Sequence, residues 1–158
     1  MSRLFPLDVG MGSLRGILKI IQENDGKMEL TDLAEESEID VDSLLPLIEA
    51  CEMLGFTKTG DSKIRLTDEG KSLNMRNTSK IMKGKLIGIE PFKSAITLLS
   101  EKDMSSDELF GSLNSIGFVF HGEKNRNDEI LKKLFMTWGV RTKMLRYDPH
   151  GDLWSVPK

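Results

Sequence analysis

The chain of 158 residues is poor in the side chains that most often build metal centres, disulfides and membrane spans. Its one cysteine, Cys51, excludes an internal disulfide and suits a reducing compartment such as the cytosol. The two histidines, His121 and His150, are far apart and in no metal-ligand spacing. The longest apolar runs, such as residues 44–48, fall well short of the roughly 20 residues of a membrane span. No apolar stretch of the secretory type follows the first charge, so we predict a cytoplasmic protein.

Catalytic signatures are also missing from the sequence. There is no G-x-x-x-x-G-K-S/T phosphate loop, no nucleophile elbow and no cofactor fingerprint. The acidic residues show no pairing typical of general acid–base catalysis. Cys51 falls on an apolar helical face, where a small buried hydrophobe is expected rather than a nucleophile. The sequence therefore predicts no enzyme, no cofactor and no metal site.

Three short helices are predicted in the first half of the chain. Residues 12–23 carry apolar side chains at the i, i+3, i+4, i+7 spacing of one buried face. Thr31 is a suitable N-cap for a second helix. A third helix is expected to start near Asp42 or Ser43, with Pro46 near its first turn. Its buried face would consist of Leu44, Leu47, Ile48, Cys51 and Leu54.

Turn chemistry then predicts a β-hairpin. Residues 56–59 and 63–66 are short β-like runs on either side of Gly60–Asp61–Ser62. Thr67 is positioned to cap a further helix. Short helices followed by a hairpin and another helix form the element order of a winged helix-turn-helix domain.

The second half repeats this order loosely. A helix is expected after Pro91, and Ser105 and Glu108 have the spacing of a capping box at the start of the next one. Residues 118–120 suggest a short strand within a loop. A long helix follows, whose buried face would consist of Leu131, Leu134, Phe135 and Trp138.

A second hairpin is expected around the turn at residues 148–152. The complete pattern predicts a mainly α fold with small β-hairpins (α+β). We interpret it as a degenerate tandem of two winged-helix units, residues 1–77 and residues 78–158, joined within residues 72–90.

Several runs of the sequence resemble a known family: Pro6, Asp8 and Val9 before Gly16, Leu33–Ala34, residues 41–50, Leu54–Gly55–Phe56, Leu66–Thr67 with Gly70, Trp138–Gly139 and Tyr147–Asp148. The chain is similar over nearly its whole length to the AAA-associated C-terminal domain of ATPase subunits in nitrate/sulfonate/taurine-type ABC transporters. The most specific part is Leu44–Leu45–Pro46–Leu47. Because these 158 residues leave no room for a nucleotide-binding domain, the resemblance implies a stand-alone version that acts on an ABC ATPase subunit in trans.

The exposed face of the third helix is predicted to be acidic and partly apolar. No lysine or arginine occurs between Met28 and Thr57, whereas nine acidic residues lie between Glu29 and Glu52. DNA phosphates would be repelled there, because binding to them depends on cations. We therefore predict a surface for a protein partner, formed by Asp42, Leu45, Pro46, Glu49 and Met53.

The second half is basic instead. Residues 124–146 contain seven lysines and arginines and two acidic residues, and Lys132 and Lys143 are expected on one exposed face of the long helix. Three interpretations stay open: contact with phosphates, docking on the acidic first half, and simple solvation. The candidate nucleic-acid surface consists of Lys124, Arg126, Lys132, Lys133, Arg141, Lys143 and Arg146.

These features favour a non-enzymatic regulatory or protein-interaction module, with an ABC ATPase subunit as the expected partner. The alternative is a transcription regulator that binds DNA through the basic second half, as a homodimer. The two differ in salt dependence, because only binding to phosphates weakens steeply as salt rises.

Overall fold

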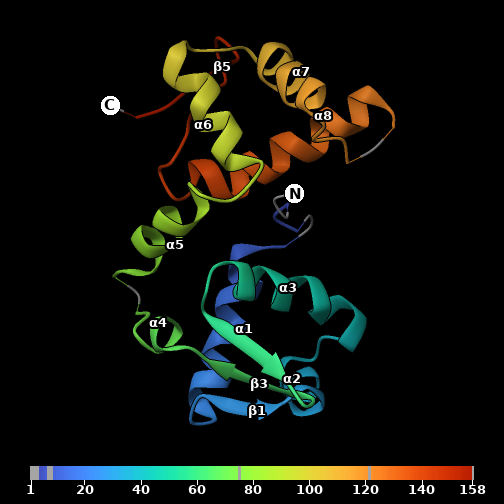
Figure 1. Cartoon of the computed structure of the whole chain (residues 1–158), viewed down its shortest axis with the longest axis vertical. Helices are drawn as coiled ribbons and strands as arrows, with labels where there is room; N and C mark the ends of the chain where they lie inside the picture. The colour runs from blue at the N-terminus through green and yellow to red at the C-terminus, as the bar shows by residue number, and fades with distance from the viewer. Residues whose placement is uncertain (1–3, 7–8, 75, 121, 158) are drawn as a thin grey trace. The chain divides into compact units, whose positions relative to one another are not determined.

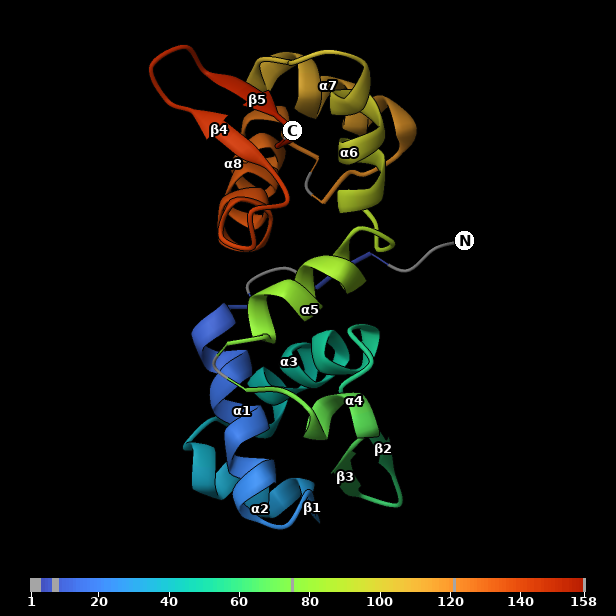
Figure 2. The same ribbon diagram turned by 90° about the vertical axis from the view of Figure 1, so that its left-hand side faces the viewer.

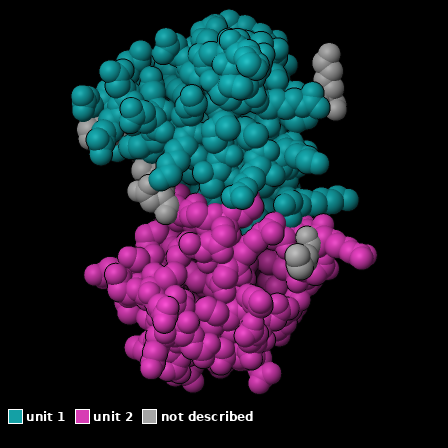
Figure 3. All heavy atoms as spheres, turned by 180° about the vertical axis from the view of Figure 1, so that it is seen from behind, with its two compact units in different colours: residues 1–5, 79–158 teal, residues 6–78 magenta. Residues whose placement is uncertain are grey.

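The computed structural model describes residues 4–6, 9–74, 76–120 and 122–157, and it divides into two compact units (Figures 1 and 3). The N-terminal unit comprises residues 6–78. The C-terminal unit comprises residues 79–158 and also takes Leu4 and Phe5 from the start of the chain. Asp8 and His121, named above, lie outside the described residues. The fold is mainly helical with small antiparallel hairpins, which confirms the predicted α+β class.

The helices of the N-terminal unit are α1 (Met11–Glu23), α2 (Leu30–Ser37), α3 (Val41–Met53) and α4 (Asp68–Lys71). The cap predicted at Thr31 is wrong: α2 begins at Leu30, after Glu29, and has no side-chain cap. The side chain of Asp40 caps α3, because its carboxylate accepts a hydrogen bond from Ser43 N at 2.7 Å. Thr67 caps α4 as predicted and accepts from Gly70 N at 3.1 Å.

The predicted buried face of α3 is confirmed, since its five apolar residues are at most 6% exposed. Pro46, however, lies more than one turn into the helix rather than near the first turn. Proline has no N–H to donate to a carbonyl group of the preceding turn. Because Pro46 is exposed, that turn is open to water. Gly55, with φ of 81°, ends α3: Phe56 N donates to Cys51 O at 2.9 Å and Gly55 N to Glu52 O at 2.9 Å.

The N-terminal unit has a three-stranded antiparallel sheet. Strand β1 (Lys27–Glu29) pairs with β3 (Lys63–Leu66), which pairs with β2 (Thr57–Gly60), so the strand order is β1-β3-β2. The hairpin of β2 and β3 was predicted, whereas β1 was not. The three residues of β1 include one apolar side chain, Met28. Such a short segment shows too little alternation of apolar and polar residues to indicate a strand.

The C-terminal unit is built from α5 (Thr78–Leu86), α6 (Phe92–Glu101), α7 (Ser106–Ile116), α8 (Lys124–Leu134), a π-helical segment η1 (Phe135–Val140) and the hairpin β4 (Arg146–Asp148) with β5 (Leu153–Ser155) (Figure 2). The helix α5 has no counterpart in the sequence-based prediction. The capping box at Ser105 and Glu108 is confirmed. The short strand expected at residues 118–120 is not formed.

Aromatic side chains fill the core of the C-terminal unit. Trp138 and Trp154 are fully buried, and Phe5 lies 5.0 Å from the Trp138 ring, centroid to centroid. Further ring contacts, at 5.6–6.1 Å, join Phe92, Phe110 and Phe135 to this cluster and to Trp154. The buried face predicted for the long helix is therefore confirmed, and it holds α6, α7 and the hairpin together.

Candidate functional site

The first candidate surface lies on α3 of the N-terminal unit. Leu45 is 54% exposed, and Val41, one turn earlier, is 46% exposed. Asp42 and Pro46 are exposed beside them. Residues four apart on a helix are neighbours, so Val41 and Leu45 form one apolar spot on an otherwise acidic helix. We call Val41, Asp42, Leu45 and Pro46 the α3 patch.

The predicted members of this surface are not all equally accessible. Glu49 and Met53 are half-buried. Val41, which the sequence-based prediction did not name, takes their place at the opposite end of α3. It was missed because the helix was expected to start one or two residues later. The centre of the patch therefore lies in the first half of α3.

The fold fixes which face of α3 points outward. Leu44, Leu47 and Ile48 are buried on one side, which leaves Leu45 and Pro46 outside. Cys51 is buried on the inner side, and burial, with a smaller contribution from Glu52, raises the pKa of its thiol to about 12. A thiol with such a pKa stays protonated near neutral pH, so Cys51 belongs to the core rather than to a reactive site.

Acidic residues are frequent in the part of the sequence that contains the α3 patch. Between Met28 and Thr57 the chain has no basic residue. Some of the carboxylates of this region have local partners: Glu36 accepts from Asn24 Nδ2 at 3.1 Å, and Glu52 accepts from the hydroxyl of Thr59. Asp42 adds a negative charge beside Leu45. The surface therefore combines accessible apolar area with negative charge.

The second candidate surface is the basic one of the C-terminal unit, and the structure separates its members. Lys124 and Arg126 lie in the first turn of α8, whereas Lys132 and Lys133 lie in its last turn. Eight residues of helix span about 12 Å, so Lys124 and Lys132 are distant neighbours. All four are exposed.

Lys132 and Lys143 do not share a helical face, which corrects the prediction. The helix changes to the π-helical segment η1 after Leu134, and Lys143 lies beyond it with φ of 64°. Arg141 immediately follows η1, and Arg146 begins β4; both are exposed. The change of helical period was not visible in the sequence, because the apolar spacing over residues 131–138 also fits an α-helix.

A groove of about 790 Å³ brings some of these cations together at the hairpin. It is lined by Lys143 and Arg146 and by Lys83 of α5, and Asp148 adds a negative charge to its lining. Lys132 lies over the ring of Tyr147, with its Nζ 5.1 Å from the ring centroid. The sequence did not single out Lys83, because this residue lies far before the basic segment of residues 124–146.

A polar network fixes the hairpin beside this groove. The carboxylate of Asp152 accepts hydrogen bonds from the Ser106 hydroxyl at 2.5 Å, from Ser106 N at 3.3 Å and from the Tyr147 hydroxyl at 2.9 Å. Trp154 Nε1 donates to the Ser106 hydroxyl at 3.0 Å. The hydrogen bond from Ser106 is the main reason why the pKa of Asp152 is lowered. The network ties the turn of the hairpin to the start of α7.

The sequence of residues 31–148 matches the family model described as the C-terminal AAA-associated domain. The chain belongs to this family. The match runs from α2 to the end of β4 and so includes the α3 patch and the three cations that line the groove of this AAA-associated chain, Lys83, Lys143 and Arg146. No curated protein and no solved structure matches the chain.

Two further findings describe this AAA-associated domain. Within residues 4–6, 9–74, 76–120 and 122–157, no group of three or more His, Cys, Asp and Glu side chains is arranged to hold a metal ion. No helix in the same part of the chain is long and apolar enough to cross a membrane.

Proposed function

We propose that this chain is a non-enzymatic, cytoplasmic winged-helix module that regulates an ABC-type ATPase subunit by direct contact through the α3 patch. The observation that carries the proposal is the pair of exposed apolar residues, Val41 and Leu45, one turn apart on an acidic helix. Membership of the AAA-associated family supports an ATPase as the partner.

The element order supports the winged-helix assignment of the N-terminal unit. The order α1, β1, α2, α3, β2, β3, with β1 paired to the second strand of the hairpin, is the arrangement of winged-helix domains. In such a domain α3 is the helix that is presented to a partner. The α3 patch thus occupies the position from which DNA-binding winged-helix domains contact the bases.

The C-terminal unit supports a tandem of two such domains. It has α6, α7 and α8 followed by the hairpin β4–β5, and an isolated antiparallel bridge pairs Met104 with Trp154. Met104 lies between α6 and α7, as β1 lies between α1 and α2. In the N-terminal unit, β1 pairs with the second hairpin strand at Ile64. In the C-terminal unit, Met104 pairs with the second hairpin strand at Trp154. The repeat is one of topology, because the sequences differ.

Physical chemistry favours a protein over DNA as the partner of α3. Bringing carboxylates against duplex phosphates costs Coulomb energy and releases no counterions. An exposed pair of aliphatic side chains, in contrast, gains free energy when a partner covers it, at about 25 cal/mol per Å² of apolar area. Apolar anchors surrounded by polar residues are typical of the centre of a protein–protein contact.

The test is a calorimetric titration of the chain with a purified ABC-type ATPase subunit from the same organism. We expect Leu45→Asp to weaken binding at least tenfold, because it places a charge where an apolar anchor is buried. Ile116→Asp is the matched control, since Ile116 of α7 is similarly exposed, at 55%, but lies on the other unit. Equal binding by the wild type and the Leu45 variant would contradict the proposal. So would a tenfold loss of affinity between 50 and 200 mM salt.

A second function, DNA binding as a homodimer through the C-terminal unit, is favoured by the groove lined by Lys83, Lys143 and Arg146. Three cations around one groove are suited to phosphate contacts. This alternative predicts that Lys143→Gln with Arg146→Gln abolishes binding to duplex DNA. The ATPase contact through α3 would remain in that variant, so the two functions can be tested separately.

A further inference from the structure

A separate charged surface lies on the N-terminal unit, on the exposed face of its three-stranded sheet. Strand pairing places Lys27 of β1 opposite Arg65 of β3, and Lys58 of β2 opposite the same Arg65. All three side chains are exposed. They form a line of cations with one member from each strand, which we call the cationic row.

The cationic row is unfavourable for the sheet by itself. Directly opposed residues of antiparallel strands have Cα atoms about 4.5–5.5 Å apart, and like charges there destabilise the pairing. Among the residues that the structure describes, no carboxylate forms an ion pair within 4.0 Å of these three cations. Glu29 of β1 is paired with Lys63 instead, at 3.8 Å. The positive charge of the row is therefore available to a ligand.

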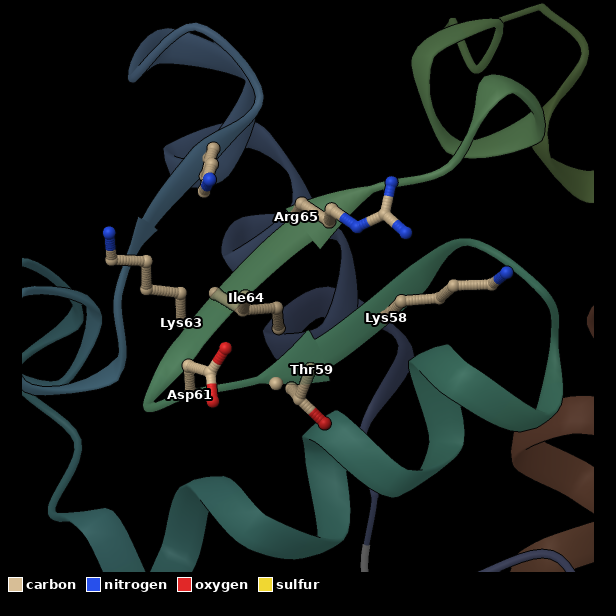
Figure 4. Close-up of a pocket in the computed structure, with 8 residues that line it drawn as sticks. Lys58, Thr59, Asp61, Lys63, Ile64 and Arg65 are labelled. Atoms are coloured by element: carbon tan, nitrogen blue, oxygen red, sulfur yellow. The ribbon is translucent and has the colours of Figure 1, made fainter.

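Neighbouring residues enlarge this positive surface. The row borders a hollow of about 360 Å³, and Asp61 of the hairpin turn is the acidic residue among the described residues that line it (Figure 4). Lys71 of α4 lies near one end of the row, because a Cβ built on Gly26 would lie 3.6 Å from Lys71 Cε. The stem of Lys71 therefore lies beside the residue that precedes Lys27. Figure 4 shows Arg65 and Lys58 on adjacent strands along the rim of the hollow.

We propose that the cationic row binds a linear chain of phosphate groups, from the backbone of a nucleic-acid strand or from inorganic polyphosphate. The row is linear, with steps of about 5 Å set by the strand spacing, so it fits a ligand whose negative charges follow one another along a thread. Arg65 lies at the centre and offers the forked donors that hold a phosphate with two hydrogen bonds. Lys27 and Lys58 flank it as point charges.

A phosphate chain fits this surface better than an acidic protein segment. Exposed ion pairs between single side chains contribute little, because solvent screens them and both side chains lose freedom. A polyphosphate thread is densely charged and carries condensed counterions, and their release drives its binding to a row of cations. The proposed site is independent of the α3 patch, and so of the ATPase contact.

The test is an anisotropy titration of a labelled mixed-sequence DNA strand with the full chain, between 50 and 200 mM NaCl. Three phosphate contacts predict a slope of about −2 in the logarithm of the association constant against the logarithm of salt concentration. Arg65→Gln and Lys58→Gln should each reduce the slope by about 0.7 and weaken binding at 50 mM several-fold. Lys19→Gln is the matched control: Lys19 of α1 is exposed on the same unit and carries the same charge, but it does not line the hollow. Circular dichroism checks that each variant is folded.

Competition identifies the source of the phosphate. Displacement of the strand by duplex DNA but not by polyphosphate assigns the site to nucleic acid, and the reverse assigns it to polyphosphate. Equal competition by polyglutamate of the same charge would overturn the preference for phosphate. An equal loss in Lys19→Gln, no binding at 50 mM salt, or complete loss in Lys143→Gln with Arg146→Gln would overturn the site itself.

Discussion

The substitution Gly70→Ala tests the close approach of α4 to the backbone of Phe56, the residue before β2. A Cβ at Gly70 would lie 2.1 Å from the carbonyl oxygen of Phe56 and 3.0 Å from its carbonyl carbon. That oxygen already accepts a hydrogen bond from Thr67 N at 2.9 Å. The Thr67 hydroxyl in turn donates to Gly55 O at 2.6 Å and accepts from Gly70 N. The added methyl group therefore meets backbone that is held on several sides.

The cost can be estimated from these contacts. Carbon and oxygen atoms that are not bonded stay about 3.3 Å apart, so α4 must move by roughly 1 Å from Phe56. The movement weakens one or two hydrogen bonds, at about 0.5–1.5 kcal/mol each, and adds about 1–3 kcal/mol of overpacking strain. The higher helix propensity of alanine returns about 1 kcal/mol. We expect a net loss of about 2–4 kcal/mol in the free energy of unfolding.

Urea unfolding followed by far-ultraviolet circular dichroism measures this loss. Tryptophan fluorescence serves as an internal reference, because Trp138 and Trp154 both belong to the C-terminal unit. Gly16→Ala is the matched control: Gly16 lies in the middle of α1 with nothing within 4 Å of its added Cβ, so we expect stabilisation by up to about 1 kcal/mol. A midpoint for Gly70→Ala at or above that of the wild type would refute the reasoning.

Two further predictions concern titrating side chains. Because Cys51 is fully buried with a thiol pKa of about 12, a maleimide should label the native protein at least about tenfold more slowly than the unfolded chain. Equal labelling rates would place Cys51 outside the core. Because Asp152 has a lowered pKa in the folded state, its stabilising effect is complete above its unfolded pKa, near 3.8, and is lost as the pH falls through the folded pKa. Asp152→Asn should therefore cost about 1–2 kcal/mol at pH 7 and progressively less below pH 4, which urea midpoints across this range would reveal.

Much of the helical and hairpin structure could be predicted locally. The apolar spacing of α1 and α3, the capping box at Ser105 and the hairpin after Phe56 are written into a few adjacent residues. Errors arose where local patterns were short or ambiguous. The strand β1 has one apolar residue, and η1 keeps a spacing that an α-helix also satisfies.

The exposure of the candidate surfaces could be predicted only in part. The outward face of α3 follows from its period, so the exposed positions of Asp42, Leu45 and Pro46 could be predicted from the sequence. Val41 depended on where the helix begins, and Asp40 decides that through its cap. The basic residues of the C-terminal unit were recognised by composition, but their grouping around Tyr147 and Lys83 depends on contacts between elements distant in sequence.

By itself, the sequence determined the family, the helices and hairpins, and the sign of the charge on each half, because these depend on residue type and on spacing within a few turns. Only the tertiary structure decided which charges meet. Pairing of β1 with β3 is a contact across more than 30 residues, and it places Lys27 beside Arg65 and Lys58. No local spacing encodes that register, since it is set by how Met28 and Ile64 are buried together under the sheet.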